Sequence, residues 1–479
     1  MINLSEYIKY DGLGLAELVR RGEVTPKELK DAALEGIAKV NPKVNAVHSV
    51  WADHAEKEID AGLPDGPLKG VPFLIKDLTL HAAGIPMNNG SRLLQGMILP
   101  HDTELMARFR KAGLVLVGTT TTPELGYNVT TEAVFYGPTH NPWNTDRSVG
   151  GSSGGSGAAV AARIVPLAHG NDAGGSIRIP SSCCGVFGLK TTRGRIPLGP
   201  DYGEILHGLA IEFALTRSIR DAAALMDAVA GPDPGAPNWA EPPSRPFLEE
   251  VSTPPRRLRI AWTAKPASGV PVDREVVDAL HNTVKLCEEL GHEMVEAAPA
   301  FDMEGFNVAT VCVGSANLAH SIGAAATAMG RTPSEQNLEA TSWATYRYGN
   351  SLTASELLHA LDVFAMVSRV VGQFFQNYDV LLTPTIARLP APLGELNANA
   401  PGVTAEQWLM QLFTYAPFTL LFNVTGQPAM SVPLAWSRED LPIGMQFAGL
   451  FAAEATLFRL AAQLEQARPW KDRLPPVHV

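Results

Sequence analysis

Two segments rich in glycine and serine limit the possible fold and function of this chain more than any other feature of the sequence. They cover residues 150–157, which read Gly-Gly-Ser-Ser-Gly-Gly-Ser-Gly, and residues 170–180, and their serines Ser152 and Ser176 are 24 residues apart. Consecutive glycines allow positive φ angles and let backbone N–H groups approach a ligand closely. A serine in such a turn can act as a nucleophile beside a backbone oxyanion site. One segment of this kind could be an inert loop, but two joined by an alanine-rich stretch predict a pair of catalytic loops.

A serine nucleophile needs a base, and the best candidate is Lys76. It follows the apolar run 71–75, where a lysine is out of place. Burial disfavours the charged form of lysine and lowers its pKa, so that the amine can accept a proton near neutral pH. A surface ion pair between Lys76 and Asp77 is the alternative. His169 also follows an apolar run, 164–168, and we expect it to be a buried histidine with its hydrogen bonds satisfied.

Two other motifs built on glycine-rich loops do not fit. Residues 150–154 match the letters of the Gly-x-Ser-x-Gly nucleophile elbow, but that elbow follows a buried strand, whereas residues 141–147 are mostly polar. A phosphate-binding loop needs a glycine directly before its lysine, and here Leu189 separates Gly188 from Lys190. Neither alternative chemistry is therefore expected.

The remaining pattern predicts an α/β fold. Residues 25–28 form a capping box at the start of an N-terminal helix, which we expect to end before Asn41 and Pro42. From about residue 70 the sequence consists of short apolar runs, such as 71–75 and 114–117, separated by helical patterns. Buried strands that alternate with helices are typical of a layered α/β fold with a mixed or parallel sheet.

A proline-rich stretch and a later βαβ-like unit suggest how the chain is organised. Eight prolines between residues 232 and 255 indicate a surface linker. A strand over 258–263, a helix over 273–290 and a strand over 293–297 then read as a βαβ-like unit. The later elements are a mostly helical region over 300–375, strands near 380–383, 429–433 and 443–447, and a last helix over 453–467.

We expect the late strands to rejoin the first sheet, so that the chain is one domain with an insertion. The predicted parts of this domain, 1–479, are N-terminal helices (1–60), a catalytic core (61–230), a proline-rich linker (231–257), an inserted βαβ-like and helical part that lines the pocket (258–375), and C-terminal strands with a final helix (376–479).

The composition argues against nucleic-acid and membrane partners. The chain has 38 Lys and Arg against 49 Asp and Glu, a net charge of −11, and such a balance gives no basic surface. No apolar run approaches the ~18 residues that span a bilayer, and the first residues lack the basic and apolar parts of a signal peptide. Four cysteines are too few for a disulfide framework. We expect a soluble, cytoplasmic protein.

The segment after the second glycine-rich loop carries a family resemblance. It reads Cys184-Gly185-Val186-Phe187-Gly188-Leu189-Lys190-Thr191-Thr192. This resembles the amidase signature family, whose defining stretch ends in Cys-Gly-Val-x-Gly-Leu-Lys-Pro-Thr, with Thr191 in place of the proline. The resemblance extends over nearly the whole chain. It implies an amidase-signature α/β fold, a large mixed twisted β-sheet sandwiched between layers of α-helices, and an amide-bond hydrolase that needs no metal or cofactor.

On matching positions the resemblance implies a Ser–cis-Ser–Lys triad and an acyl-enzyme intermediate. Ser176 would be the nucleophile, Ser152 the bridging serine after a cis peptide bond, and Lys76 the base. The backbone N–H groups that would hold the oxyanion belong to Ala173, Gly174, Gly175 and Ser176. The residues that would support the loops are Ser153, Asp172 and Arg178. A homodimer is a common assembly in the family.

Shorter segments indicate which members of the family the chain resembles more closely. Several of them, including 141–149 and 168–173, resemble the nylon-oligomer hydrolases within the family, and Cys312 lies where those enzymes have a substrate-contacting cysteine. Cys312 could also be a small buried hydrophobic residue on a helix. Ile179 replaces a glutamine that is usual in the glutaminase subunit of tRNA-dependent amidotransferases. The side chains expected in the substrate pocket are Cys312, Ile179 and Asn128.

The expected substrates are small non-peptide amides, linear or cyclic. Carbamates and aryl esters are an alternative, because they react through the same acyl-serine chemistry. A glutaminase subunit acting in a tRNA-binding complex is a second alternative, disfavoured by Ile179 and by the acidic balance. An aromatic stretch, which comprises Phe413, Tyr415, Phe418 and Phe422, is expected in the core, with an acyl or aryl pocket as the other reading.

Overall fold

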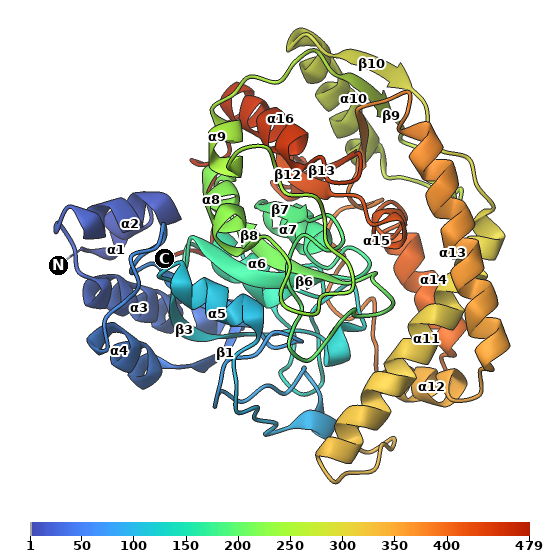
Figure 1. Ribbon diagram of the computed structural model, residues 1–479, viewed down its shortest axis with the longest axis horizontal. Coiled ribbons are helices and arrows are strands. Elements are labelled where there is room, and N and C mark those ends of the chain that lie inside the picture. Colours follow the sequence, from blue (N-terminus) through green and yellow to red (C-terminus); the bar gives the residue numbers. More distant parts are fainter. Residues whose placement is uncertain (1) are drawn as a thin grey trace.

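The computed structural model, which describes residues 2–479, contains an eleven-stranded sheet that runs through the molecule (Figure 1). The strand order is β1-β3-β2-β6-β8-β7-β12-β13-β11-β9-β10. β2 is parallel to β3 and β6, and β9 is parallel to β10 and β11, whereas the strands between them pair antiparallel. The predicted mixed sheet is therefore confirmed. Its strands are β1 (Val47–Val50), β2 (Pro72–Lys76), β3 (Val115–Thr120), β6 (Leu167–Asp172), β7 (Phe187–Lys190), β8 (Ile211–Thr216), β9 (Arg259–Trp262), β10 (Glu293–Glu296), β11 (Val380–Pro384), β12 (Ala429–Trp436) and β13 (Pro442–Gly449).

Helices flank this sheet, and the residues between them form an apolar core. α8 (Ile219–Val229), α9 (Phe247–Val251) and α16 (Glu454–Ala467) pack against one another and lie side by side in Figure 1. α6 (Gly154–Ala161) and α7 (Arg178–Cys184) pack together against strands β6, β7 and β12. The other helices are α1 (Leu4–Tyr7), α2 (Gly12–Arg20), α3 (Pro26–Val44), α4 (Ala52–Asp60), α5 (Glu104–Lys111), α10 (Arg274–Glu289), α11 (Met303–Ala328), α12 (Ala340–Gly349), α13 (Ala354–Phe374), α14 (Ala405–Tyr415) and α15 (Leu421–Thr425), and a two-stranded ribbon joins β4 (His140–Asn141) to β5 (Asn144–Ser148).

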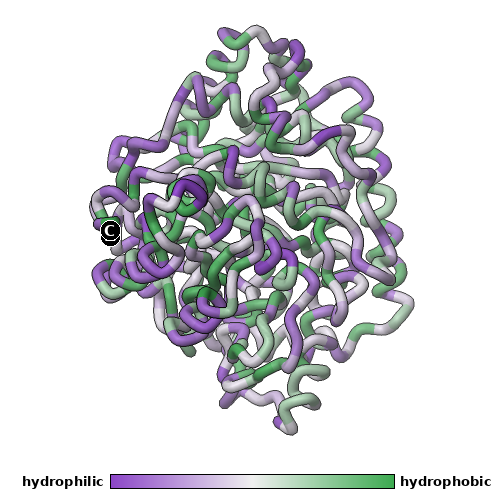
Figure 2. The backbone as a smooth tube through the Cα atoms, turned by 60° about the vertical axis from the view of Figure 1, so that its left-hand side comes forward, coloured by the Kyte–Doolittle hydropathy of each residue, from purple (hydrophilic) through white to green (hydrophobic). Residues whose placement is uncertain are grey.

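Most surface helices are amphipathic, which fits them to this layered arrangement. Figure 2 shows hydrophobic and hydrophilic stretches alternating along the outer helices. α10, for example, buries Val276, Leu280 and Val284 on one side, spaced four residues apart. Residues at this spacing lie on one face of a helix, so the face can cover the sheet while the other face meets water.

Helix α3 corrects one sequence expectation. It begins at the predicted capping box of Thr25 and Glu28, but it runs through Pro42 to Val44 instead of ending before Asn41. A proline in the last turn removes one helical hydrogen bond and leaves the rest of the helix intact. The Asn41 side chain then closes this end, because its Oδ1 accepts from the N–H groups of Ala46 and Val47 at 2.8 Å each.

The late strands rejoin the first part of the sheet, as the sequence pattern suggested. Residues 429–431 of β12 pair antiparallel with residues 188–190 of β7. The βαβ-like unit of β9, α10 and β10 attaches at the far edge, where β9 pairs parallel with β11. The C-terminal strands thus lie beside the strand that follows the two glycine-rich loops.

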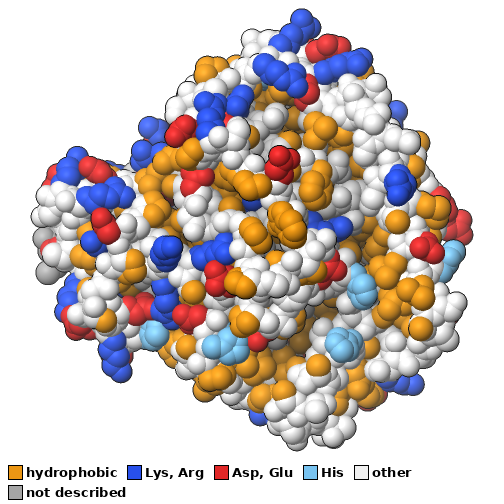
Figure 3. All heavy atoms as spheres, viewed as in Figure 1, with side chains coloured by type: hydrophobic (Ala, Val, Ile, Leu, Met, Phe, Trp, Pro, Cys, Tyr) orange, Lys and Arg blue, Asp and Glu red, His pale blue; other side chains and the backbone are white. Residues whose placement is uncertain are grey.

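Helices α11 and α13 correct the expectation that no segment is long and apolar enough to span a bilayer. Both reach that length with a mean hydropathy of 1.3 over 18 residues, and 50% of that window is buried in α11 and 22% in α13. Neither helix holds an unbroken apolar run of that length, but alanine, valine and leucine raise the mean hydropathy around scattered polar residues. The two helices pack against each other and lie on the right in Figure 1. Figure 3, in the same view, shows hydrophobic side chains gathered on that side of the molecule.

Candidate active site

Two neighbouring parallel strands bring the chemistry of the glycine-rich loops to one edge of the sheet. β2 ends at Lys76 and β6 ends at Asp172, and the two strands pair through Leu74 and Ala168. Because parallel strands end at the same edge, the loops that follow them meet there. The turn after β6 carries Ser176 into α7, and the first glycine-rich loop carries Ser152 into α6.

Lys76 is fully buried and joins two polar partners. Its Nζ lies 2.7 Å from Ser152 Oγ and 2.6 Å from Asn171 Oδ1. Burial lowers the pKa of Lys76 to about 7, against the opposing charges of Glu212 and Asp172. A substantial share of this amine is therefore neutral near pH 7 and can accept a proton. The surface ion pair with Asp77 does not form, since both side chains have 0% exposure.

Ser152 lies between the buried lysine and the cavity. Its side chain is 2% exposed, and the peptide bond from Gly151 is cis, as the family resemblance implied. Any Cβ on Gly151 would come within 2.5 Å of the Thr130 carbonyl oxygen, so only glycine fits there. Thr122 Oγ1 donates to the Ser152 carbonyl at 3.1 Å and fixes the loop from the other side.

Ser176 is the most accessible of the three predicted catalytic residues. It is half-buried, at the turn between β6 and α7, and it lines the same cavity as Ser152. Within residues 2–479 its hydroxyl has no hydrogen-bond partner, although its carbonyl accepts from Ser153 N at 3.1 Å. The Ser153 hydroxyl donates to the Asn171 carbonyl at 3.2 Å. Ser153 thus ties the two glycine-rich loops together.

The turn before Ser176 places backbone N–H groups of lining residues beside the cavity. Gly175 has a φ of +133°, and its N–H donates to Asp172 Oδ1 at 2.8 Å. The predicted oxyanion group at Gly175 is therefore engaged by a carboxylate. In the described part of the chain, the N–H groups of Ala173, Gly174 and Ser176 have no partner, and they remain available to an oxyanion.

Asp172 and Arg178 form a buried ion pair that fixes this turn. Arg178 donates through Nη2 to Asp172 Oδ1 at 2.8 Å and through Nε to Oδ2 at 3.0 Å. Burial alone would raise the pKa of Asp172, but Arg178 and Asn423 outweigh it and hold that pKa below its usual range. Arg178 also donates to the Thr419 carbonyl, to Gln446 Oε1 and to Asn423 Oδ1, each at 2.7 Å. These contacts place both residues behind the loops, with no side chain of either in the cavity.

His169 has a structural position, as its sequence context predicted. Its ring is fully buried, and Nε2 lies 2.5 Å from Glu212 Oε2 while Nδ1 accepts from the backbone N–H of Lys76 at 3.2 Å. The ring thereby holds the end of β2 in place. It does not line the cavity.

The cavity in front of the two serines encloses about 1460 Å³, part of it open to solvent. None of the side chains that line it in the described chain is charged at neutral pH. Asn128 and Ile179 line it, as predicted, and Asn128 Nδ2 donates to the Leu396 carbonyl at 3.0 Å. Besides Ile179 and three alanines, the apolar and aromatic lining residues are Leu78, Leu125, Tyr127, Val129, Tyr202, Ile205, Leu206, Leu209, Val313, Leu318, Leu409, Leu412, Phe413 and Leu420.

Cys312 does not reach this cavity. Helix α11 turns Thr310, Val313 and Gly314 toward it, whereas Cys312 is buried in an apolar cluster with Phe306 and Phe364 and is not among the lining residues. Successive residues of a helix point about 100° apart, so neighbours of a lining residue face other partners. Of the two sequence readings, the buried hydrophobic residue matches this placement. The aromatic stretch divides similarly, because Phe413 lines the cavity while Tyr415, Phe418 and Phe422 do not.

The sequence did not single out Asn171 or Asn423, although both shape the site. Asn171 accepts from Lys76, and its Nδ2 donates to the Leu78 carbonyl at 3.3 Å. Asn423 Nδ2 donates to Asp172 Oδ1 at 2.9 Å. Only the position of Asn171 in the sequence could have indicated its role, since it lies beside Asp172 inside the second glycine-rich segment. An uncharged asparagine side chain is otherwise not unusual in a loop.

Comparisons with known proteins place the chain in a family. The amidase family model matches residues 28–458. The 6-aminohexanoate-cyclic-dimer hydrolase of Paenarthrobacter ureafaciens is 39% identical over 477 residues, which cover 97% of this chain and 96% of that protein. The acylamidase of Rhodococcus erythropolis is 35% identical over 488 residues, which cover 96% of each chain. A solved structure of 6-aminohexanoate cyclic dimer hydrolase complexed with substrate has a TM-score of 0.93 and 37% identity, covering 98% of this chain and 99% of that one.

The resemblance expected from the signature segment is therefore confirmed over nearly the full length. The family match and the full-length likeness to two amide-cleaving enzymes together establish that this chain belongs to the amidase family.

Proposed function

We propose that this amidase hydrolyses small uncharged amides, linear or cyclic, through a triad of Ser176, Ser152 and Lys76. The observation that carries the triad is the 2.7 Å contact between buried Lys76 Nζ and Ser152 Oγ, beside a serine that faces the cavity. A lysine whose pKa lies near 7 and which contacts a serine hydroxyl is arranged as a base.

The three groups are increasingly buried from Ser176 to Ser152 to Lys76, and in the proposed acylation the proton moves in that order. Ser176 Oγ attacks the substrate carbonyl and gives its proton to Ser152 Oγ, and Ser152 passes its own proton to the neutral amine of Lys76. Asn171 Oδ1 keeps the amine directed at Ser152 from the opposite side, 2.6 Å away. The C–N bond then breaks, and the proton returns from Lys76 through Ser152 to the leaving amine.

The oxyanion that forms during the attack needs hydrogen-bond donors. The N–H groups of Ala173, Gly174 and Ser176 are free to serve, while Asp172 holds the turn through Gly175. Donors fixed before the reaction stabilise developing charge without the cost of reorganising solvent. A water molecule then attacks the acyl-serine ester, with Lys76 and Ser152 accepting and returning the proton, and releases the acid.

The cavity supports an uncharged substrate. Its lining has no side chain to neutralise a carboxylate or an ammonium, and a charge left without a partner away from water costs several kcal/mol. A cyclic amide with both its amino and carboxyl groups in amide bonds meets this requirement. The relative named for a cyclic dimer of 6-aminohexanoate is consistent with such a substrate here.

Carbamates and aryl esters are the second candidate class, because an apolar cavity beside the same serine would accept them equally well. A glutaminase subunit is disfavoured, since free glutamine carries an ammonium and a carboxylate that this lining would leave unpaired. Activity of the purified single chain would also exclude an obligate partner.

The test compares kcat/KM for a neutral anilide, its analogue with a terminal carboxylate, and an ester and a carbamate with the same aryl leaving group. We expect the neutral anilide to exceed its carboxylate analogue by at least about 100-fold. A preference for the carboxylate analogue would overturn the proposed substrate class. Ser176→Ala, with an unchanged far-UV spectrum, provides the control for turnover that does not use the triad.

A further inference from the structure

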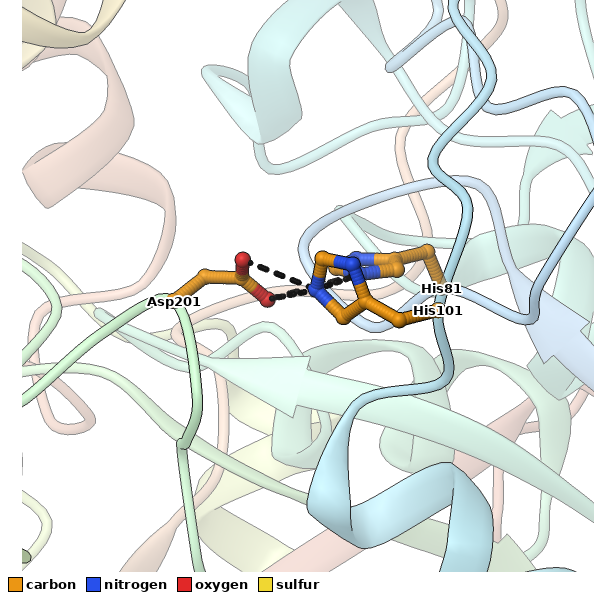
Figure 4. Close-up of side chains that lie close together, drawn as sticks. All are labelled: His81, His101 and Asp201. Carbon is orange, nitrogen blue, oxygen red and sulfur yellow. Dashed lines mark hydrogen bonds and ion pairs between the residues drawn. The ribbon is translucent and has the colours of Figure 1, made fainter.

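Outside the amidase site, two histidines and one aspartate direct their ligand atoms at a common point (Figure 4). His81 Nε2 lies 3.4 Å from His101 Nε2 and 3.4 Å from Asp201 Oδ2. His101 Nε2 lies 3.0 Å from Asp201 Oδ1 and 3.2 Å from Oδ2. The histidines come from the segment between β2 and α5, and Asp201 comes from the segment between β7 and β8. The cluster therefore joins loops that are 100 residues apart in sequence.

Hydrogen bonding alone leaves this triangle unsatisfied. His81 Nδ1 lies 3.2 Å from the Thr79 carbonyl oxygen, which can only accept, so the proton of the neutral ring belongs on Nδ1. His81 Nε2 then presents a lone pair to the Asp201 carboxylate. His101 Nε2 carries at most one proton and cannot serve both neighbours.

The geometry points to a site for Zn²⁺ in which His81, His101 and Asp201 are the three protein ligands. Zinc takes imidazole nitrogen and carboxylate oxygen at about 2.0–2.2 Å in a tetrahedron, which sets neighbouring ligand atoms about 3.3 Å apart. The separations among His81 Nε2, His101 Nε2 and Asp201 Oδ2 are 3.4, 3.4 and 3.2 Å, close to that spacing. The Thr79 carbonyl supplies the outer hydrogen bond that metal-binding histidines usually make.

The fourth position of the tetrahedron would be filled by water, since the nearby acid is already used. Asp102 accepts from Ala83 N at 2.7 Å and from Arg110 Nε at 2.7 Å. His101 and Asp201 keep 40% and 29% of their side chains exposed, so a cation can enter from solvent.

This zinc would act on the walls of the amidase cavity and take no part in the bond cleavage. Thr79 and Tyr202 line the cavity, two residues before His81 and one residue after Asp201. A cation held between the two loops would clamp both walls, and its occupancy would stabilise the arrangement in which they meet. The site does not depend on which amide the enzyme cleaves.

The direct test is metal binding by tag-free, chelator-treated full-length protein, followed by competition with a chromogenic zinc indicator. We expect one Zn²⁺ per chain, a rise in Tm on binding, and visible d–d bands of four-coordinate geometry when Co²⁺ replaces Zn²⁺. His101→Asn and Asp201→Asn should each weaken Zn²⁺ binding by at least about 10-fold and abolish the Co²⁺ bands. Both side chains are partly exposed, so the variants should fold.

His359→Asn, at an exposed position on α13, is the matched control and should leave Zn²⁺ binding unchanged. Failure of the wild-type chain to bind Zn²⁺ would overturn the inference, as would equal affinity in the wild type and in both ligand variants. Because the readout is binding and spectroscopy, it is independent of the amidase assay.

Discussion

Lys76 Nζ and Ser152 Oγ lie 2.7 Å apart in a region where one side chain is fully buried and the other is 2% exposed. The cavity reaches Ser152 but stops short of Lys76. We therefore expect the proton that the proposed nucleophile releases to reach Lys76 through Ser152.

The activity should depend on pH through Lys76. The proposed base must be neutral, and burial lowers the pKa of Lys76 to about 7. Below that pH the amine is protonated and cannot accept, so kcat/KM should rise about tenfold per pH unit on the acid side and level off above about pH 7. The measurement is the pH profile of kcat/KM for a neutral anilide. A flat profile between pH 5 and 8 would contradict the role of Lys76.

The two adjacent glycines of the turn should differ in their tolerance of alanine. A Cβ on Gly174 would meet only Leu420 Cδ1, at 3.7 Å, whereas a Cβ on Gly175 would come within 2.6 Å of Thr419 Oγ1. Gly175 also has a φ of +133°, which alanine adopts only with strain. We expect Gly174→Ala to keep kcat within about threefold and Gly175→Ala to lose at least about 100-fold. Similar kcat values for the two variants would contradict this reading of the turn.

The buried pair of Asp172 and Arg178 should contribute to both folding and catalysis. Asp172→Asn leaves the Arg178 charge buried without its carboxylate, and breaking such a pair costs about 3–5 kcal/mol. Urea denaturation measures the change in the free energy of unfolding, and we also expect a lower kcat because the turn loses its anchor. Asp278→Asn removes an exposed, 3.9 Å pair with Arg274 and should leave both quantities unchanged. An unaltered unfolding midpoint in Asp172→Asn would rule out the anchoring role.

Neighbouring residues of α11 should separate substrate contact from packing. Both residues belong to the apolar cluster of Phe306 and Phe364, but only Val313 also lines the cavity. Val313→Ala should change KM for a bulky neutral amide several-fold, while Cys312→Ala should leave KM unchanged and lower Tm slightly. The comparison needs only steady-state kinetics and thermal melts of the two variants. A KM effect confined to Cys312→Ala would return the cysteine to the pocket.

The sequence was most informative where one residue type is out of place. A lysine after an apolar strand and serines among glycines indicated Lys76 and the two loops, and the family resemblance singled out Ser152 and Ser176. The structure brings the three residues to one edge of the sheet. Alternation of short apolar runs with helical patterns likewise gave the mixed sheet. These signals are local, so they survive without knowledge of tertiary contacts.

Features that depend on tertiary contacts could not be predicted from the sequence. Helix α11 is apolar on all sides, so its pattern did not distinguish the direction of Cys312 from that of Val313. The end of α3 depends on how Asn41 bonds the following backbone, which outweighs the proline beside it. His81, His101 and Asp201 have no metal-ligand spacing and meet only because two distant loops fold together.

Intact-protein mass spectrometry of quenched reactions with acyl anilides, lactams and aryl carbamates would show whether Ser176 carries the acyl group. We expect a mass increment equal to the acyl or carbamoyl group, mapped by digestion to Ser176 and absent in Ser176→Ala. An adduct on another residue, or undiminished turnover by Ser176→Ala, would contradict this expectation.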